Sequence, residues 1–284
     1  MKEQTGSKTK DPVAELEEQI AYYKAELERL KNKSNFPYVY IVVAIPTTVL
    51  FVTLSIISNG LIDFTSGITA ALFFSLLITC AYLVLYQPNR EEMIRELVRK
   101  IRKLTREKAK LEAGIKGERE VAYHLRWLPK SYIVLNDIKL PSEKYETQQF
   151  DHIVVGPNGL FHLETKSVNG IVVISETGDW TLIKAVRNNL VREGMDSPHH
   201  QIQRHEMVLR EFLKANLATI KVPLRSVVVM AHPKTIVEGE DPHLPVIKKD
   251  KLLDFIQNYE SERRLNKKEV RQVALALVQG SVEE

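Results

Sequence analysis

The sequence contains a single cysteine, Cys80, so no disulfide can form within the chain. A disulfide-stapled scaffold is therefore excluded, and the composition is compatible with a reducing compartment. The sequence also lacks a Walker-type phosphate loop and any internal repeat. The first 36 residues are polar and charged, so they do not resemble a cleavable signal peptide.

Charged residues are almost absent from one long stretch. Between Tyr38 and Tyr86 there is no Lys, Arg or Glu, and Asp63 is the only acid. Two apolar runs within it, Tyr38–Ile57 and Ile68–Tyr86, each have the length that crosses a bilayer core, and tyrosines stand near their ends, where aromatic belts form. We therefore expect a transmembrane hairpin over residues 37–87, with helices at about 38–57 and 68–86.

The basic residues around this hairpin predict its orientation. The connection Ser58–Gly67 has no Lys or Arg, whereas six basic residues flank the hairpin: Lys31, Lys33, Arg90, Arg95, Arg99 and Lys100. Because positively charged flanks stay on the cytoplasmic side, both termini of a multi-pass cell-membrane protein are expected in the cytoplasm.

Amphipathic helices are expected on both sides of the hairpin, in residues 1–36 and 88–112. Apolar residues spaced by three and four form a seam on each: Leu16, Ile20, Tyr23, Leu27 and Leu30 on the first, and Ile94, Leu97, Ile101, Leu104 and Leu111 on the second. We infer that the two pair antiparallel as a stalk, or join as a coiled coil in a homo-oligomer. The first could instead lie on a membrane surface. The second is basic, which suits anionic lipid, phosphates or a solvated stalk.

The run Phe150–Lys166 reads as a β-hairpin. Its two halves are rich in β-branched and aromatic residues, and Gly156-Pro157-Asn158-Gly159 between them has turn chemistry. If the turn closes symmetrically, Asp151 faces Glu164 across the ladder. Opposed acids repel each other, so this pair needs a cation between the carboxylates, and a divalent metal is the simplest choice.

Side-chain alternation places Lys166 on the same face as Glu164, while Thr165 points the other way. The acid pair and the amine therefore share one surface. The alternative is an ordinary amphipathic hairpin whose polar face carries Asp151, His162, Glu164 and Lys166.

These residues resemble a known family. An Asp before an apolar strand, then Glu-x-Lys on the next, preceded by the helix start Gly114, Gly117 and Glu118, is similar to the nuclease-related domain (NERD) family of the PD-(D/E)XK restriction-endonuclease-like superfamily. The resemblance covers roughly Ala113–Leu252. It implies an α/β fold, a restriction-endonuclease-like αβββαβ core with a mixed sheet, in a domain over residues 113–284.

The order of elements agrees with that core. We expect a helix at 117–128, strands at 132–140, 150–155, 160–166 and 225–231, and helices at 198–217, 249–259 and 267–279. Segments 170–175 and 180–184 are expected to extend the same sheet. Ser197 is expected to cap the helix that begins at Pro198.

The resemblance also implies roles for residues of the site. Asp151 and Glu164 would hold Mg2+ or Mn2+, the carbonyl of Thr165 would add a ligand, and Lys166 would orient the attacking water. Glu118 would complete the acidic site. Its helix spacing directs it toward the core with Val121, Ala122 and Leu125, although a first-turn helix-dipole acid is the alternative. Gln201 matches a family glutamine that would contact the metal or a phosphate, or else it faces solvent.

The main hypothesis is thus a membrane-anchored, Mg2+-dependent cytoplasmic nuclease acting on DNA or RNA. From Gly114 onward, however, 24 Lys and Arg stand against 23 Asp and Glu, so no overall basic field indicates nucleic-acid binding. A non-catalytic scaffold that binds nucleic acid or protein at the inner membrane face is the alternative, and a membrane sensor is a third. His199, His200 and His205 have no cysteine partner and no familiar zinc spacing, so zinc is not expected.

Overall fold

The computed structural model describes residues 11–32, 45, 49–50, 52–53, 64–187 and 189–282. The chain divides into two compact units, Met1–Leu111 and Glu112–Glu284. Helix α4 (Phe64–Leu125) contributes residues to both units.

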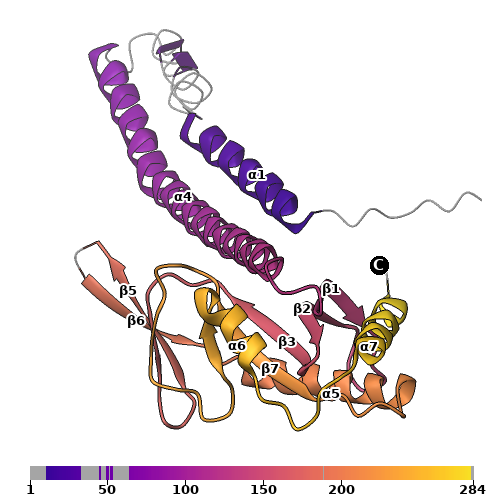
Figure 1. Ribbon diagram of the computed structural model, residues 1–284. Coiled ribbons are helices and arrows are strands. Elements are labelled where there is room, and N and C mark those ends of the chain that lie inside the picture. The colour runs from indigo at the N-terminus through magenta and orange to yellow at the C-terminus, as the bar shows by residue number, and fades with distance from the viewer. Residues whose placement is uncertain are drawn as a thin grey trace, which may run out of the picture. The chain divides into compact units, whose positions relative to one another are not determined.

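In the first unit, helix α1 (Pro12–Asn32) lies beside α4 (Figure 1). Near the end of α1, Arg90 donates to the carbonyl of Leu30, with Nη2 and the oxygen 2.6 Å apart. Near its start, Glu17 pairs with Lys108 at 2.7 Å. The two helices therefore run antiparallel within one chain, which is one of the two arrangements predicted. Both predicted seams lie at this contact, because their residues are buried or half-buried while most of their neighbours are exposed.

The structure describes only one of the two predicted membrane helices in full. Nearly all of the run Tyr38–Ile57 lies outside the described residues, whereas Ile68–Tyr86 is part of α4. Among the helices that the structure describes, none combines the length and apolar character needed to cross a bilayer.

Three separately predicted helices form one. The segments at 68–86, 88–112 and 117–128 all belong to α4, which ends at Leu125 rather than near Leu128. Pro88 does not end the helix, and neither do Gly114 and Gly117. A helix interior can hold such residues at a cost of about 1 kcal/mol for Gly and about 3 kcal/mol for Pro, which other interactions offset.

The second unit is built on a five-stranded mixed sheet in the order β1-β2-β3-β7-β9. Its strands are β1 (Ile133–Leu140), β2 (Gln148–Gly156), β3 (Gly159–Lys166), β7 (Leu224–Met230) and β9 (Val246–Lys248). The first three are antiparallel, and β3, β7 and β9 are parallel. The predicted hairpin register is confirmed, since Val155 pairs with Leu160 and Gly156 with Gly159.

A second, four-stranded sheet was not predicted. It has the order β6-β5-β4-β8 and consists of β4 (Ile171–Ile174), β5 (Trp180–Val186), β6 (Asn189–Met195) and β8 (Ile236–Glu238). The expectation that segments 170–175 and 180–184 extend the central sheet was therefore wrong. The physical reason is that β2 and β7 occupy both edges of β3, which leaves no free edge beside it.

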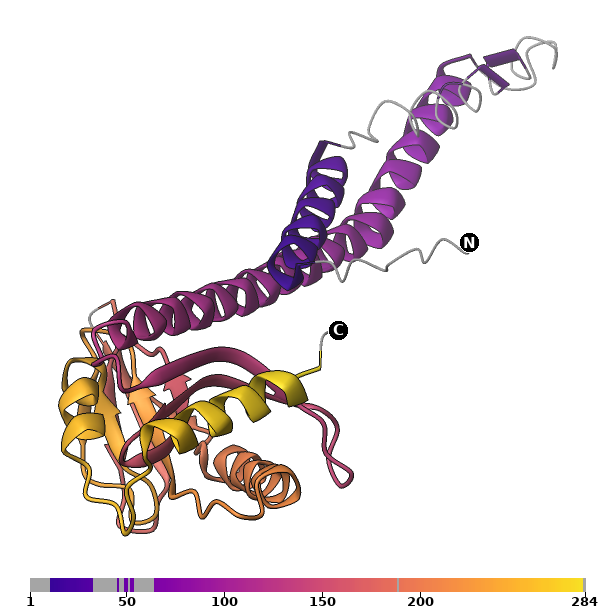
Figure 2. The same ribbon diagram turned by 45° about the vertical axis from the view of Figure 1, so that its right-hand side comes forward.

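Helices cover both faces of the central sheet. On one face, α5 (His199–Asn216) and α7 (Lys267–Gly280) bury apolar residues against β1 and β2, and Figure 2 shows α7 lying along these strands. On the other face, the last turns of α4 pack with α6 (Leu252–Asn258), which follows the short 3-10 helix η2 (Lys249–Lys251). The second unit is thus a mixed α/β domain, and the predicted helices near its C-terminus are confirmed.

Candidate functional site

Three polar side chains meet at the carboxyl end of β3. Lys166 Nζ donates to Glu164 Oε1 at 2.6 Å and to Gln201 Oε1 at 3.3 Å. Gln201 Nε2 in turn donates to Glu164 Oε2 at 2.9 Å. Lys166 and Glu164 therefore lie on one face, as side-chain alternation predicted, and Gln201 faces this pair rather than solvent.

Helix α5 delivers Gln201 from its first turn. Its N-cap is Pro198 and no side chain caps it, so the predicted Ser197 cap was placed one residue off. Ser197 Oγ still accepts from the amide of His199, at 3.3 Å. α5 covers the polar face of the hairpin, and Glu164 is only 2% exposed. The alternative of an ordinary amphipathic hairpin with a solvated polar face does not fit this burial.

Asp151 lies on β2 one residue before His152, whose pairing with Leu163 ends the ladder between β2 and β3. One carboxylate oxygen, Oδ2, accepts from the amide of Thr165 at 2.8 Å. Because Thr165 follows Glu164 directly on β3, this bond holds Asp151 against the end of β3, beside Glu164. The hydroxyl of Thr165 is buried and has no hydrogen-bond partner among the described residues.

Glu118 reaches the site from α4. It is half-buried, and its electrostatic neighbours are Asp151, Asp137 and Lys166. Gly117 makes this approach possible, because a Cβ at this position would lie 2.7 Å from the Cβ of Ser167, the residue that follows β3. A side chain at 117 would keep the helix away from the strand end.

Burial, together with repulsion from neighbouring acids, raises the pKa of each of these three acids. Burial raises the pKa of Glu164 to about 7, and the Asp151 charge adds to the rise, although Lys166 and Gln201 oppose it. The pKa of Asp151 is raised by burial against the opposing effect of the Thr165 amide. Burial and Asp151 also raise the pKa of Glu118. Positive charge placed among these acids would favour their ionised forms.

The donor set fits a hard divalent cation. Carboxylates of Asp151, Glu164 and Glu118 are oxygen ligands, which Mg2+ and Mn2+ prefer. A cation among these groups would favour their ionised forms and so lower their raised pKa values.

A fourth acid near the site was missed from the sequence. Asp137 in β1 lies close enough to Asp151 to raise the pKa of Asp151. The side chain of Asp137 also accepts a hydrogen bond from Gln149 Nε2 at 2.6 Å. Its backbone adopts a left-handed φ of 54°, which is uncommon for a residue other than glycine. Nothing in the local sequence distinguishes Asp137 from an ordinary polar residue of an exposed strand.

Behind Glu164 lies a buried pair of histidines that was also missed. His162 Nε2 and His205 Nδ1 are 3.1 Å apart, and His162 Nδ1 is 3.1 Å from Ser226 Oγ. His205 Nδ1 lies 3.9 Å from Glu164 Oε2. With Glu164, these two are the one set of three potential metal ligands found close together in the described part of the chain.

The histidine pair forms a hydrogen-bonded row that backs Glu164. Burial lowers the pKa of His162 to about 3 and that of His205 to about 4, so both rings are neutral at pH 7. The 3.1 Å between His162 Nε2 and His205 Nδ1 is a hydrogen-bond distance, and Phe150 packs against both rings. His199 and His200 do not belong to this group. Alternation along β3 already placed His162 on the face of Glu164, which was the available signal.

A second acid of this helix, Glu120, pairs with a lysine that is distant in the sequence. Its carboxylate pairs with Lys249 Nζ at 2.5 Å, an interaction that also lowers the pKa of Glu120. Glu118 and Glu120 therefore separate, with Glu118 directed to the site and Glu120 bonded to η2. The partner lies 129 residues away in the sequence, so helix spacing alone could not find it.

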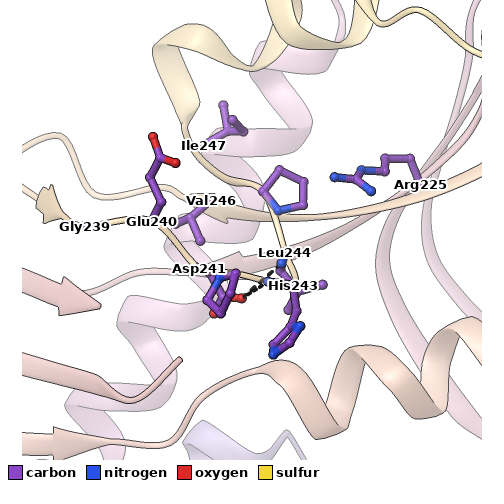
Figure 3. Close-up of a pocket in the computed structure, with 10 residues that line it drawn as sticks. Arg225, Gly239, Glu240, Asp241, His243, Leu244, Val246 and Ile247 are labelled. Carbon is purple, nitrogen blue, oxygen red and sulfur yellow. Dashed lines mark hydrogen bonds between the residues drawn. The ribbon is translucent and has the colours of Figure 1, made fainter. Parts of the chain in front are cut away.

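A pocket of about 310 Å3 lies apart from these residues. Arg225 and the loop from Gly239 to Ile247 line it, and Figure 3 shows Asp241 hydrogen-bonded to this loop. Arg225 stands near the start of β7, five residues from Met230, which pairs with Lys166. That separation is about 16 Å along the strand. None of the candidate site residues lines this pocket.

Fold and site together describe an α/β domain with a buried carboxylate and lysine centre at the end of its central strands. Residues 113–231 match the family model described as nuclease-related domain, NERD, and the matched range includes the five predicted catalytic residues. The chain is also 30% identical over 134 residues to an uncharacterized protein from Bacillus anthracis. That alignment covers 46% of this chain and 58% of the relative. No solved structure is significantly similar to the chain.

Proposed function

We propose that the domain is a metal-dependent nuclease that hydrolyses phosphodiester bonds of DNA or RNA. The match of residues 113–231 to a nuclease-related domain indicates the general function. The observation that carries the proposal is the contact of Lys166 with Glu164 and Gln201, beside Asp151 and with three raised carboxyl pKa values. A merely structural salt bridge would not need further acids around it.

The proposed fold is a restriction-endonuclease-like core. The last turns of α4, the antiparallel strands β1, β2 and β3, helix α5 and the parallel strand β7 follow the order αβββαβ. The strands β4, β5 and β6 are an insertion between β3 and α5 in this scheme. This order supports the assignment because it brings α4 with Glu118, β2 with Asp151, and β3 with Glu164 to the same end of the sheet.

In the proposed mechanism, Asp151, Glu164 and Glu118 would hold Mg2+ or Mn2+, with the carbonyl of Thr165 as a further ligand. The cation would supply Lewis-acid chemistry at the scissile phosphate. Lys166 orients the attacking water and stabilises negative charge that develops on the phosphate oxygens. The water oxygen forms a new bond to phosphorus as the bond to the leaving sugar oxygen breaks, the water releases one proton to solvent, and the leaving oxygen takes up a proton from solvent. Gln201 fixes both Glu164 and Lys166.

A nuclease assay tests this function directly. Purified full-length protein is incubated with labelled single- and double-stranded DNA and RNA in Mg2+, Mn2+ or EDTA. We expect cleavage that requires metal and that falls by more than about 100-fold in Lys166→Ala, since removing one group that stabilises developing charge typically costs that much. Lys184→Ala is the matched control, because Lys184 also pairs with a glutamate but lies on β5. Cleavage that survives in Lys166→Ala would refute the proposal.

We further propose that residues 37–87 anchor the domain to the cell membrane as a multi-pass hairpin, with both termini cytoplasmic. The support is the near absence of charge between Tyr38 and Tyr86 and the basic flanks.

The protein is expected to stay in the membrane fraction during extraction with alkaline carbonate. Protease added outside intact cells is expected to leave the C-terminal domain whole, and to digest it once the cells are permeabilised. Release into the supernatant, or digestion in intact cells, would contradict the anchor or its orientation.

A further inference from the structure

The end of α4 and the turn after it carry an exposed face of aromatic and basic residues. This aromatic-basic face consists of Lys116, Arg119, Tyr123, Arg126, Trp127 and Lys130, all of which are exposed. Tyr123 is 60% exposed and Trp127 is 69% exposed. The two rings are four residues apart, about 6 Å along the helix axis, because the amide of Trp127 continues the turn by donating to His124.

The positive charge of this face is only partly balanced by acids within the described residues 116–130, where Glu120 interacts with Lys116. That segment contains two acids, Glu118 and Glu120. Glu120 is bound to Lys249, and Glu118 turns toward Asp151 in the candidate site. Arg126 lies 5.8 Å from the ring centre of Tyr123, so guanidinium and aromatic groups already alternate there. The face therefore combines two flat apolar surfaces with four cations.

We propose that the aromatic-basic face binds single-stranded nucleic acid and leads it to the candidate site. Bases stack on Tyr123 and Trp127, while phosphates contact the cations around them. A single strand fits better than a duplex, since paired bases stack on each other and present no free ring face. The inference rests on the proposed nuclease function and names its substrate class.

The position of the face supports this path. Arg119 directly follows Glu118, and Tyr123 lies about 7.5 Å from Glu118 along the helix axis. At 100° per residue, Arg119 and Arg126 lie between the directions of Glu118 and Tyr123 around the helix. A strand stacked on the aromatics would therefore cross cations before it meets the acids. This local basic surface also accounts for nucleic-acid binding by a domain with nearly balanced charge.

Binding in EDTA tests the inference separately from cleavage. Full-length protein is titrated into fluorescently labelled 20-nucleotide oligo-dT, oligo-U and a mixed-sequence duplex, and anisotropy is measured. Trp127→Ala is expected to weaken single-strand binding about 10-fold, and Tyr123→Ala with Trp127→Ala about 100-fold, with a smaller effect on the duplex. Arg119→Gln is expected to reduce the slope of log K against log salt by about 0.7.

Tyr22→Ala is the matched control, because Tyr22 is 65% exposed but lies on α1. It is expected to bind as the unchanged protein does. Trp127→Leu keeps apolar area without an aromatic ring and is expected to weaken binding nearly as much as Trp127→Ala. Single-strand binding that is unchanged in the double variant, or that falls equally in Tyr22→Ala, would overturn the inference.

Two other occupants would be detected in the same study. In liposomes with brominated acyl chains, quenching of the Trp127 fluorescence would show that the face contacts lipid and would overturn the proposal. Dissociation of an oligomer by Trp127→Ala, seen by sedimentation with oligonucleotide binding unchanged, would assign the face to a second copy. Binding that depends on Trp127 without cleavage in Mg2+ would refute the nuclease alone. Cleavage with binding independent of Trp127 would refute only this inference.

Discussion

Replacing Glu164 with glutamine is expected to abolish cleavage and, without metal, to make the protein more stable at pH 8. Cleavage should fall by more than about 100-fold, because the neutral amide removes a metal ligand and the partner of Lys166. The stabilisation follows from burial, which raises the pKa of Glu164 from 4.5 to about 7. Between these values the folded protein holds the proton more tightly than the unfolded chain.

The pH dependence has a definite sign. The raised pKa contributes stability that is fully present below pH 4.5 and is lost as pH rises through about 7. At pH 8, the free energy of unfolding of Glu164→Gln should therefore exceed that of the unchanged protein by roughly 3 kcal/mol, since one pKa unit corresponds to about 1.4 kcal/mol. In a domain of this size that is a Tm difference of several degrees. At pH 5 the difference should shrink to less than about 1 kcal/mol, because Glu164 is then protonated in the folded protein and only partly ionised in the unfolded chain.

Thermal melts in EDTA at pH 5 and pH 8 provide this measurement. Mg2+ or Mn2+ at about 100 times its Kd should stabilise the unchanged protein by about 2.7 kcal/mol, and should not stabilise Glu164→Gln. Glu193→Gln serves as a control, since Glu193 pairs with Lys184 on the exposed β5 and β6 hairpin. A Glu164→Gln protein that melts well below the unchanged protein at pH 8 would instead indicate a structural ion pair.

Gly117→Ala is expected to reduce cleavage by about 10- to 100-fold. The new Cβ would lie 2.7 Å from the Cβ of Ser167 and 3.2 Å from that of Ala231, so α4 must move away from the end of β3. That movement carries Glu118 away from the site, and a displacement of about 1 Å can cost about 100-fold in rate. Overpacking of this kind costs about 1–3 kcal/mol, partly offset by the better helix propensity of alanine.

Gly114→Ala is the matched control in the same helix. Nothing lies within 4 Å of a Cβ at this position, so the substitution should stabilise the helix by about 0.5–1 kcal/mol and leave cleavage unchanged. Adding Ser167→Gly to Gly117→Ala removes the nearest colliding atom and should restore most of the lost activity. Unchanged cleavage in Gly117→Ala, or no recovery in the double variant, would show that close packing does not position Glu118.

The central hairpin illustrates how much local sequence can determine. A two-residue turn within Gly156-Pro157-Asn158-Gly159 sets the register, and Gly159 adopts a φ of +120°, which glycine tolerates. Register and alternation then place Glu164 and Lys166 together. The seam of α1 and the helix α7 were predictable for the same reason, since a period of three to four residues reports the buried face of a helix.

Contacts between distant segments could not be predicted in this way. The strands β4 and β5 carry an ordinary strand pattern, but their place in a second sheet depends on β7 occupying the edge of β3. The sequence pattern likewise divided α4 into several helices at Pro88 and near Gly117. Local sequence shows the helix-propensity cost of proline and glycine, but it does not show the interactions that offset this cost. The partner of Glu120 is chosen by the position of η2.

The sequence by itself determined the acids, the lysine and the strand that presents them, because turn chemistry and side-chain alternation act over a few residues. Only the tertiary structure decided what surrounds them. It buried Glu164 under α5, placed His162 and His205 behind it, and brought Glu118 close through Gly117. These effects depend on packing between segments that are far apart in the chain, and burial by that packing is what raises the carboxyl pKa values.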